Sequence, residues 1–157
     1  MKLFARAVVL AAAAMLAAPA LAADAAVQRP IFQFVDAFNK GDAAGAQAIM
    51  ATDLTIIDEV APFLWHGSDA FARWGADYEV DAKAKGITDP GVTISAPTRE
   101  LVSGDTAYVI VPSVYRFKQK GVQMSETAQM TFALHKGAAG WKISGWTWTG
   151  PDATPAK

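Results

Sequence analysis

Residues 31–42 read IFQFVDAFNKGD, and this stretch sets the start of the fold. Its apolar residues recur at the i, i+3, i+4 and i+7 spacing that places side chains on one face of an α-helix. Pro30 suits the first turn of this helix, and Gly41 is a typical stop signal at its end. Asp42 can then cap a second short helix over residues 43–51. The apolar positions are Ile31, Phe34, Val35 and Phe38.

A strand and a third helix follow before the pattern changes. Residues 54–58 are expected to form the strand and residues 60–67 a loop. Ser68 is suited to cap the third helix, which is expected to end near residues 85–86. The apolar stripe of this helix consists of Phe71, Trp74 and Tyr78.

Beyond a turn expected at residues 89–91, apolar and polar residues alternate with the period of a β-strand. Four strands are predicted in this part of the chain. Pro112 lies inside the second of them and predicts a bulge or a sheet edge at that point. The predicted strands are residues 92–96, 106–117, 122–135 and 141–149.

The order of the elements predicts the fold class. Helices come first and strands last, which is typical of an α+β fold with a mostly antiparallel sheet, and not of alternating βαβ units. We expect the long strands to curl around the first helix. The predicted architecture is a cone-shaped α+β barrel, in which three N-terminal helices pack on a curved, mostly antiparallel sheet.

Four segments of this pattern resemble the nuclear transport factor 2-like superfamily, which includes ketosteroid isomerase and the SnoaL-like polyketide cyclases. They are similar to that family's passage from the first helix into the second, its first strand, the start of its third helix and its last strand. The resemblance covers residues 30–149 and implies an open cone in a homodimer. The segments are residues 34–42, 51–58, 66–71 and 140–143.

The N-terminus is expected to be a cleavable signal peptide over residues 1–22, followed by a flexible lead-in over residues 23–29. Lys2 and Arg6 give a positive start, residues 7–18 are apolar, and Ala20-Leu21-Ala22 is a small-x-small cleavage site. A buried Ala-rich helix is the alternative interpretation. Export would place the protein in the periplasm or outside the cell. The domain then occupies residues 30–149 and a short tail residues 150–157.

Charge and cysteine content exclude several function classes. The chain has 14 Lys+Arg and 15 Asp+Glu, and two of the basic residues lie in residues 1–22, so the remainder carries 12 against 15, or −3. Such a balance does not favour binding to nucleic acid or to an anionic membrane. The absence of cysteine excludes disulfides, thiolate catalysis and cysteine-based zinc sites.

Asp58 is the candidate catalytic residue. At the end of the first strand, facing an apolar cavity, it could act as a general base whose basicity is raised by desolvation. The resemblance places it where ketosteroid isomerases carry a proton-transferring aspartate. A surface aspartate that closes the strand is the alternative. Alternation along the strand predicts that its neighbour Glu59 faces solvent.

The resemblance also places Phe34 and about Met130 where those isomerases carry hydrogen-bond donors for an oxyanion. Neither side chain is a strong donor. Losing one such donor typically costs about 10²- to 10³-fold in rate, so steroid-type isomerisation is not expected. A slip of one residue in the alignment would put Gln129 in place of Met130.

Aromatic residues suggest a ligand pocket. Trp146 and Trp148 share one face of the last strand, and pockets are largely apolar with a few placed polar groups. His66 lies in a loop that could rim the mouth. Tryptophans that fill the core or a dimer interface are the alternative. The candidate ligand-binding residues are Phe34, Trp65, His66, Tyr115, Met130, Trp146 and Trp148.

Three functions remain open. The first is an exported domain that binds a small apolar or amphipathic molecule without turnover. The second is a cofactor-independent acid–base isomerase, dehydratase or cyclase that uses Asp58. The third is a structural dimerisation module, since the strand over residues 106–117 is apolar on both faces. No cofactor is expected, and no metal, because His66 and His135 lack metal-ligand spacing.

Overall fold

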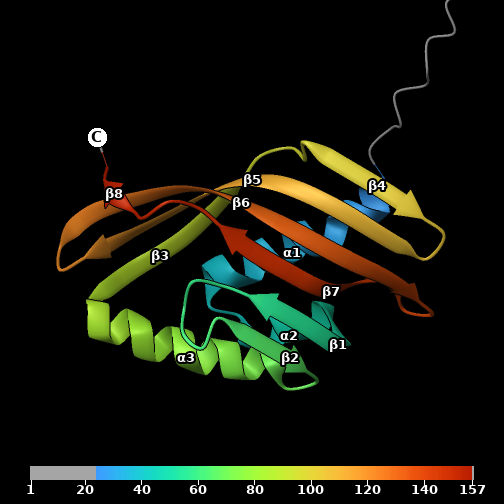
Figure 1. Ribbon diagram of the computed structural model, residues 1–157, viewed down its shortest axis with the longest axis horizontal. Helices are drawn as coiled ribbons and strands as arrows, with labels where there is room; N and C mark the ends of the chain where they lie inside the picture. Colours follow the sequence, from blue (N-terminus) through green and yellow to red (C-terminus); the bar gives the residue numbers. More distant parts are fainter. Residues whose placement is uncertain (1–23, 157) are drawn as a thin grey trace, which may run out of the picture.

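The computed structural model describes residues 24–156, so the expected signal peptide over residues 1–22 lies outside the described part (Figure 1). None of the described helices is long and apolar enough to cross a membrane. The elements are α1 (Ala25–Lys40), α2 (Ala43–Ile49), β1 (Met50–Ile57), β2 (Leu64–Gly67), α3 (Ala70–Lys85), β3 (Ile87–Ile94), β4 (Arg99–Ser103), β5 (Thr106–Gln119), β6 (Val122–Gly137), β7 (Gly140–Thr149) and β8 (Thr154–Pro155).

The strands form one sheet in the order β2-β1-β7-β6-β5-β3, with β4 paired to β5 and β8 paired to β6. Every pairing is antiparallel except that of β1 with β7. Helix α1 packs on β3 and β7, while α3 contacts β1, β2 and β3. Because β2 and β3 are the two ends of the sheet order, α3 spans its opposite edges. The predicted α+β fold, with three helices on a curved and mostly antiparallel sheet, is confirmed.

Helix α1 begins earlier than the sequence pattern predicted. It starts at Ala25, where the side chain of Asp24 accepts a hydrogen bond of 2.9 Å from the backbone of Ala26. Pro30 therefore lies inside the helix, and the expected flexible lead-in is wrong for residues 25–29. The physical reason is Val27, which is fully buried and adds one more turn to the apolar stripe.

The ends of the helices follow the expected chemistry more closely. Gly41 ends α1 in the left-handed conformation, at φ 65°, and Gly86 ends α3 in the same way. The side chain of Asp42 accepts a hydrogen bond from the backbone of Gly45 at 2.8 Å, which confirms the predicted cap of α2. Asp69, and not Ser68, occupies the cap position of α3, without a side-chain hydrogen bond.

The turn expected at residues 89–91 is wrong. These residues belong to β3, whose pairing with β5 shifts between Thr88 and Gly91. Asp89 adopts a positive φ of 52° there, and its carboxylate forms an ion pair with Lys118 across the sheet at 2.9 Å. The Asp-Pro-Gly sequence therefore makes a bulge within a strand.

Pro112 lies where the neighbours of β5 change. The ladder with β6 is continuous from Thr106 to Gln119, so no bulge occurs on that side. On the other side β4 pairs up to Ile110, and β3 begins at Ser113. The carbonyl of Pro112 accepts from the backbone of Ser95 at 3.0 Å, so the missing N–H of the proline faces this gap. The edge interpretation is correct.

The C-terminal tail, expected to be loose, is docked along the sheet. Thr154 and Pro155 pair with β6, and the backbone of Ala156 donates to the carbonyl of Gln123 at 2.9 Å. Figure 1 shows β8 beside β6, next to the C-terminus.

Candidate functional site

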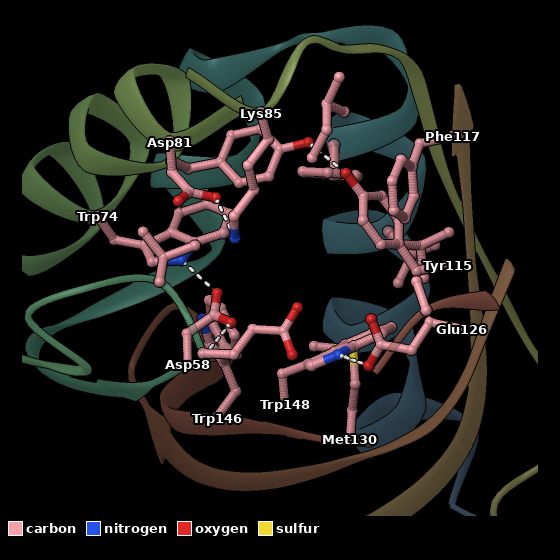
Figure 2. Close-up of a pocket in the computed structure, with 18 of the residues that line it drawn as sticks. Asp58, Trp74, Asp81, Lys85, Tyr115, Phe117, Glu126, Met130, Trp146 and Trp148 are labelled. Carbon is pink, nitrogen blue, oxygen red and sulfur yellow. Dashed lines mark hydrogen bonds and ion pairs between the residues drawn. The ribbon is translucent and has the colours of Figure 1, made fainter. Parts of the chain in front are cut away.

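A cavity of about 360 Å³ lies between α1, α3 and the inner face of the sheet, and Figure 2 shows side chains arranged around an open centre. Eight of the residues that line it are aromatic. Aromatic rings on α1 and α3 contact aromatic rings on β5 and β7. For example, Trp74 and Trp146 pack perpendicular to each other, with 5.1 Å between their ring centroids. The aromatic lining residues are Phe34, Phe38, Trp74, Tyr78, Tyr115, Phe117, Trp146 and Trp148.

Asp58 follows the last residue of β1 and faces this cavity. The indole Nε1–H of Trp74 donates to its Oδ2 at 2.5 Å, and the backbone N–H of Glu59 donates to its Oδ1 at 2.6 Å (Figure 2). Burial raises the pKa of Asp58, while the bond from Trp74 opposes that rise. The side chain is thus oriented on both oxygens and more basic than an exposed aspartate.

Glu59 also lines the cavity, although it remains exposed to solvent. The expectation that it points away from the site of Asp58 is wrong, because β1 ends at Ile57 and strand alternation does not continue past it. Partial burial, reinforced by the negative charges of Glu126 and Asp58, raises the pKa of Glu59 to about 7.

Glu126 is the functional candidate that sequence reasoning missed. It projects inward from β6, is 2% exposed, and accepts a hydrogen bond from the indole Nε1–H of Trp148 at 2.6 Å (Figure 2). Burial raises the pKa of Glu126, with the bond from Trp148 opposing the rise. A signal for it existed: Glu126 lies an even number of residues before Met130 and Phe132, so alternation places all three on one face.

Two tyrosine hydroxyls from opposite walls of the cavity meet. The hydroxyl oxygens of Tyr78 on α3 and Tyr115 on β5 are 2.8 Å apart and share a hydrogen bond. Burial raises the pKa of both phenols, so both remain neutral. One proton is used between them, and the other is available to donate to a ligand. The cavity therefore has hydroxyl donors, at positions other than the Phe34 and Met130 considered from the sequence.

The cationic side chain that lines the cavity is Lys85, and it already has a partner. Its Nζ lies 2.8 Å from an oxygen of Asp81, one turn earlier on α3. From the other side, the docked tail places Asp152 and Ala153 along the wall.

Six of the eight predicted site residues line this cavity, and two do not. Trp65 is buried behind the wall, where its Nε1–H donates to Asp77 at 2.8 Å. His66 lies exposed on β2, 3.3 Å from Asp53. Both belong to a strand that pairs on the outer side of β1, which is why they miss the cavity. The six that line it are Phe34, Asp58, Tyr115, Met130, Trp146 and Trp148.

Met130, and not its neighbour Gln129, faces the cavity. Its side chain is buried and lines the cavity, whereas Gln129 is exposed on the other face of β6. The inward position therefore carries a thioether and not an amide donor.

Comparison with known proteins identifies the family. The sequence matches the SnoaL-like domain family over residues 27–147. This chain belongs to the SnoaL-like family. A comparison with curated proteins found no match.

Solved structures of the nuclear transport factor 2-like superfamily share this fold. A ketosteroid isomerase-like protein from Erwinia carotovora atroseptica SCRI1043 is 20% identical, with a TM-score of 0.63 over 82% of this chain and 95% of that one. A hexachlorocyclohexane dehydrochlorinase is 15% identical, with a TM-score of 0.67 over 85% and 88%. A nuclear transport factor 2-like protein from Salmonella enterica serovar Typhimurium LT2 is 15% identical, with a TM-score of 0.65 over 83% and 92%.

Proposed function

We propose that this SnoaL-like domain binds a small, apolar or amphipathic molecule in its cavity. The observation that carries the proposal is an aromatic cavity of about 360 Å³ into which a few oriented polar groups project. Ligand sites are mostly apolar concavities of this size class, in which a small number of polar groups fix orientation. Fold alone does not select a ligand, so the proposal rests on the site itself.

Nile red, a neutral dye that fluoresces in apolar surroundings, tests this proposal. Val92 lines the cavity and is half-buried, whereas Val80 is exposed on α3 away from it. We expect the wild-type protein and Val80→Trp to bind the dye with the same affinity. Val92→Trp should fill the cavity and weaken binding about tenfold or more. Equal dye binding in all three proteins would place the dye outside the cavity and contradict the proposal.

A second candidate function is acid–base catalysis by Asp58, without a cofactor. The observation that favours it is the geometry of Asp58, which is half-buried, raised in pKa and fixed by two donors on the wall of a cavity that also holds tyrosine hydroxyls. Titratable groups with perturbed pKa values gather at catalytic sites. Isomerisation, dehydration and cyclisation all begin with such a proton transfer.

Exchange of carbon-bound hydrogen in D₂O, followed by NMR over a panel of enolisable ketones, tests this second candidate. Asp58→Asn keeps an acceptor for Trp74 but removes the base, so exchange should fall about 10²-fold or more. Asp36→Asn alters an exposed residue of α1 and should leave exchange unchanged. Exchange that persists in Asp58→Asn would exclude the aspartate as the base.

We infer further that the protein is exported, to the periplasm or beyond, and acts as a homodimer. Export is supported by the charge and apolar pattern of residues 1–22. Dimerisation is supported by the apolar side chains of Leu101, Val102 and Tyr108, which remain exposed on β4 and β5. Mass measurement of protein recovered from the exported fraction tests both inferences. A monomer whose N-terminus retains residue 1 would contradict both.

If the cavity admits no ligand, a structural dimerisation module is the remaining function.

A further inference from the structure

The cavity holds an excess of negative charge. Five carboxyl groups line it against the one ammonium group of Lys85, which is paired with Asp81. The other four come from three separate parts of the chain: the end of β1, the first third of β6 and the docked tail. Those four are Asp58, Glu59, Glu126 and Asp152.

The four carboxyls act on one another, and the fold neutralises them only in part. The charges of Glu126, Asp58 and Asp152 each raise the pKa of Glu59, while the charge of Lys85 lowers it. Their hydrogen-bond donors are neutral: the indole of Trp74 and the backbone of Glu59 for Asp58, and the indole of Trp148 for Glu126. The remaining titratable lining groups are the neutral phenols of the tyrosine pair. Compensation must therefore come from protons or from a cation that enters.

The walls suit a diffuse organic cation. The faces of indole, phenol and phenyl rings carry negative potential and attract ammonium groups, most strongly where water is excluded. The rings of Tyr115 and Trp148 are nearly perpendicular, with 6.1 Å between their centroids, on the side of the cavity where Glu126 lies. Among residues 24–156, no three His, Cys, Asp or Glu side chains are grouped closely enough to hold a metal ion. The separation of the carboxyl groups therefore favours a larger, organic cation over a metal ion.

We propose that the ligand of this cavity is an organic ammonium ion with an apolar body. Its charge lies among the four carboxyls and the ring faces. This inference rests on the proposed binding function and adds the chemical class of the ligand to it.

Two isosteric probes test the inference. (3-Hydroxyphenyl)trimethylammonium carries a permanent positive charge, and 3-tert-butylphenol has the same shape with carbon in place of nitrogen. We expect the cation to bind about tenfold tighter or more in calorimetry near pH 7 at physiological ionic strength, where surface attraction is screened. The anion 3-hydroxybenzenesulfonate should not bind.

Matched variants locate the effect. Glu126→Gln retains an acceptor for Trp148 while removing one cavity charge, and should abolish most of the preference for the cation. Glu79→Gln removes the same charge from the exposed face of α3 and should leave the preference intact. Val92→Trp should weaken binding of both probes.

Proton release provides a second readout. The pKa of Glu59 is about 7, so near that pH the free protein holds about half a proton there, and a neighbouring cation would expel it. Binding of the ammonium probe should therefore release protons, detected as a dependence of the binding enthalpy on the buffer. The neutral phenol should release none.

The outcomes separate this inference from the proposed function. Equal or tighter binding of 3-tert-butylphenol, lost in Val92→Trp, would overturn the ammonium inference and leave small-molecule binding in place. Cation binding unchanged by Val92→Trp and Glu126→Gln would reveal surface attraction and also overturn it. Failure of both probes and of Nile red to bind would contradict both proposals.

Discussion

At the scale of single residues, Glu59 makes the stability of the protein depend on pH. Its pKa is raised from 4.5 to about 7 by partial burial and neighbouring carboxylates. A group that binds its proton more tightly when folded stabilises the fold below its unfolded pKa, and this contribution is lost as pH rises through the folded value. The wild-type protein should therefore lose stability between about pH 4.5 and pH 7.

Glu59→Gln should remove this part of the pH dependence, because an amide does not titrate. Allowing for the exposure of Glu59 to water and salt, we expect a gain of about 1 kcal/mol at pH 8 and little change at pH 5, measured by urea unfolding. Glu79→Gln on the exposed face of α3 should behave as wild type. Parallel pH profiles of stability for wild type and Glu59→Gln would show that folding does not raise the pKa of Glu59, and would contradict this prediction.

The sequence predicted the residues whose position depends on one element. Asp58 follows from the end of a strand, Trp146 and Tyr115 from strand alternation, and Met130 from the resemblance to the ketosteroid isomerases. It missed the contribution of Glu126, whose burial depends on the ring of Trp148 reaching it from a neighbouring strand. Alternation along β6 places Glu126 on the same face as Met130, but the contact with Trp148 joins residues on different parts of the sheet and is not contained in that periodicity.

At the scale of elements, the docked tail forms part of the cavity wall. Gly150 has no side chain, which allows the tail to lie close to Glu126 and Ala128. A Cβ atom at this position would clash with Oε1 of Glu126 and lie 2.9 Å from the Cβ of Ala128. Gly150→Ala should therefore displace the tail and lower stability by about 1–3 kcal/mol. It should also weaken the binding of any ligand that contacts Asp152.

Thermal unfolding of Gly150→Ala and Gly75→Ala gives the matched comparison. Gly75 lies inside α3 with open space around its Cβ position, so alanine there should stabilise the helix by about 0.5–1 kcal/mol. Opposite shifts in melting temperature are expected. A Gly150→Ala protein as stable as wild type would mean that the tail does not need its close approach to Glu126.

The boundaries of elements were predictable where one signal dominated. Gly41 and Gly86 marked helix ends correctly because a left-handed cap needs glycine. Two local signals gave wrong boundaries. Pro30 does not mark the start of α1, because the burial of Val27 extends the helix. The Asp89-Pro90-Gly91 sequence does not end β3, because pairing with β5 continues on both sides of the bulge. Tertiary packing overrode local preference in both cases.

At the scale of the whole molecule, the order of helices and strands was sufficient to predict the architecture. An early amphipathic helix and late, long antiparallel strands have few compact solutions, and the curved sheet around α1 is one of them. The acidic character of the cavity was not predictable in the same way. It arises because the end of β1, the first third of β6 and the tail converge only in the folded chain.

Native mass spectrometry of the gently purified protein, with (3-hydroxyphenyl)trimethylammonium added, tests most directly whether this cavity is a binding site. We expect one probe per chain in the wild-type protein and in Val80→Trp, and loss of the complex in Val92→Trp, whose new indole fills the cavity. A small molecule retained from the cell at the same stoichiometry would identify the natural ligand. No complex with this probe or with 3-tert-butylphenol, or the same complex in Val92→Trp, would contradict the binding function.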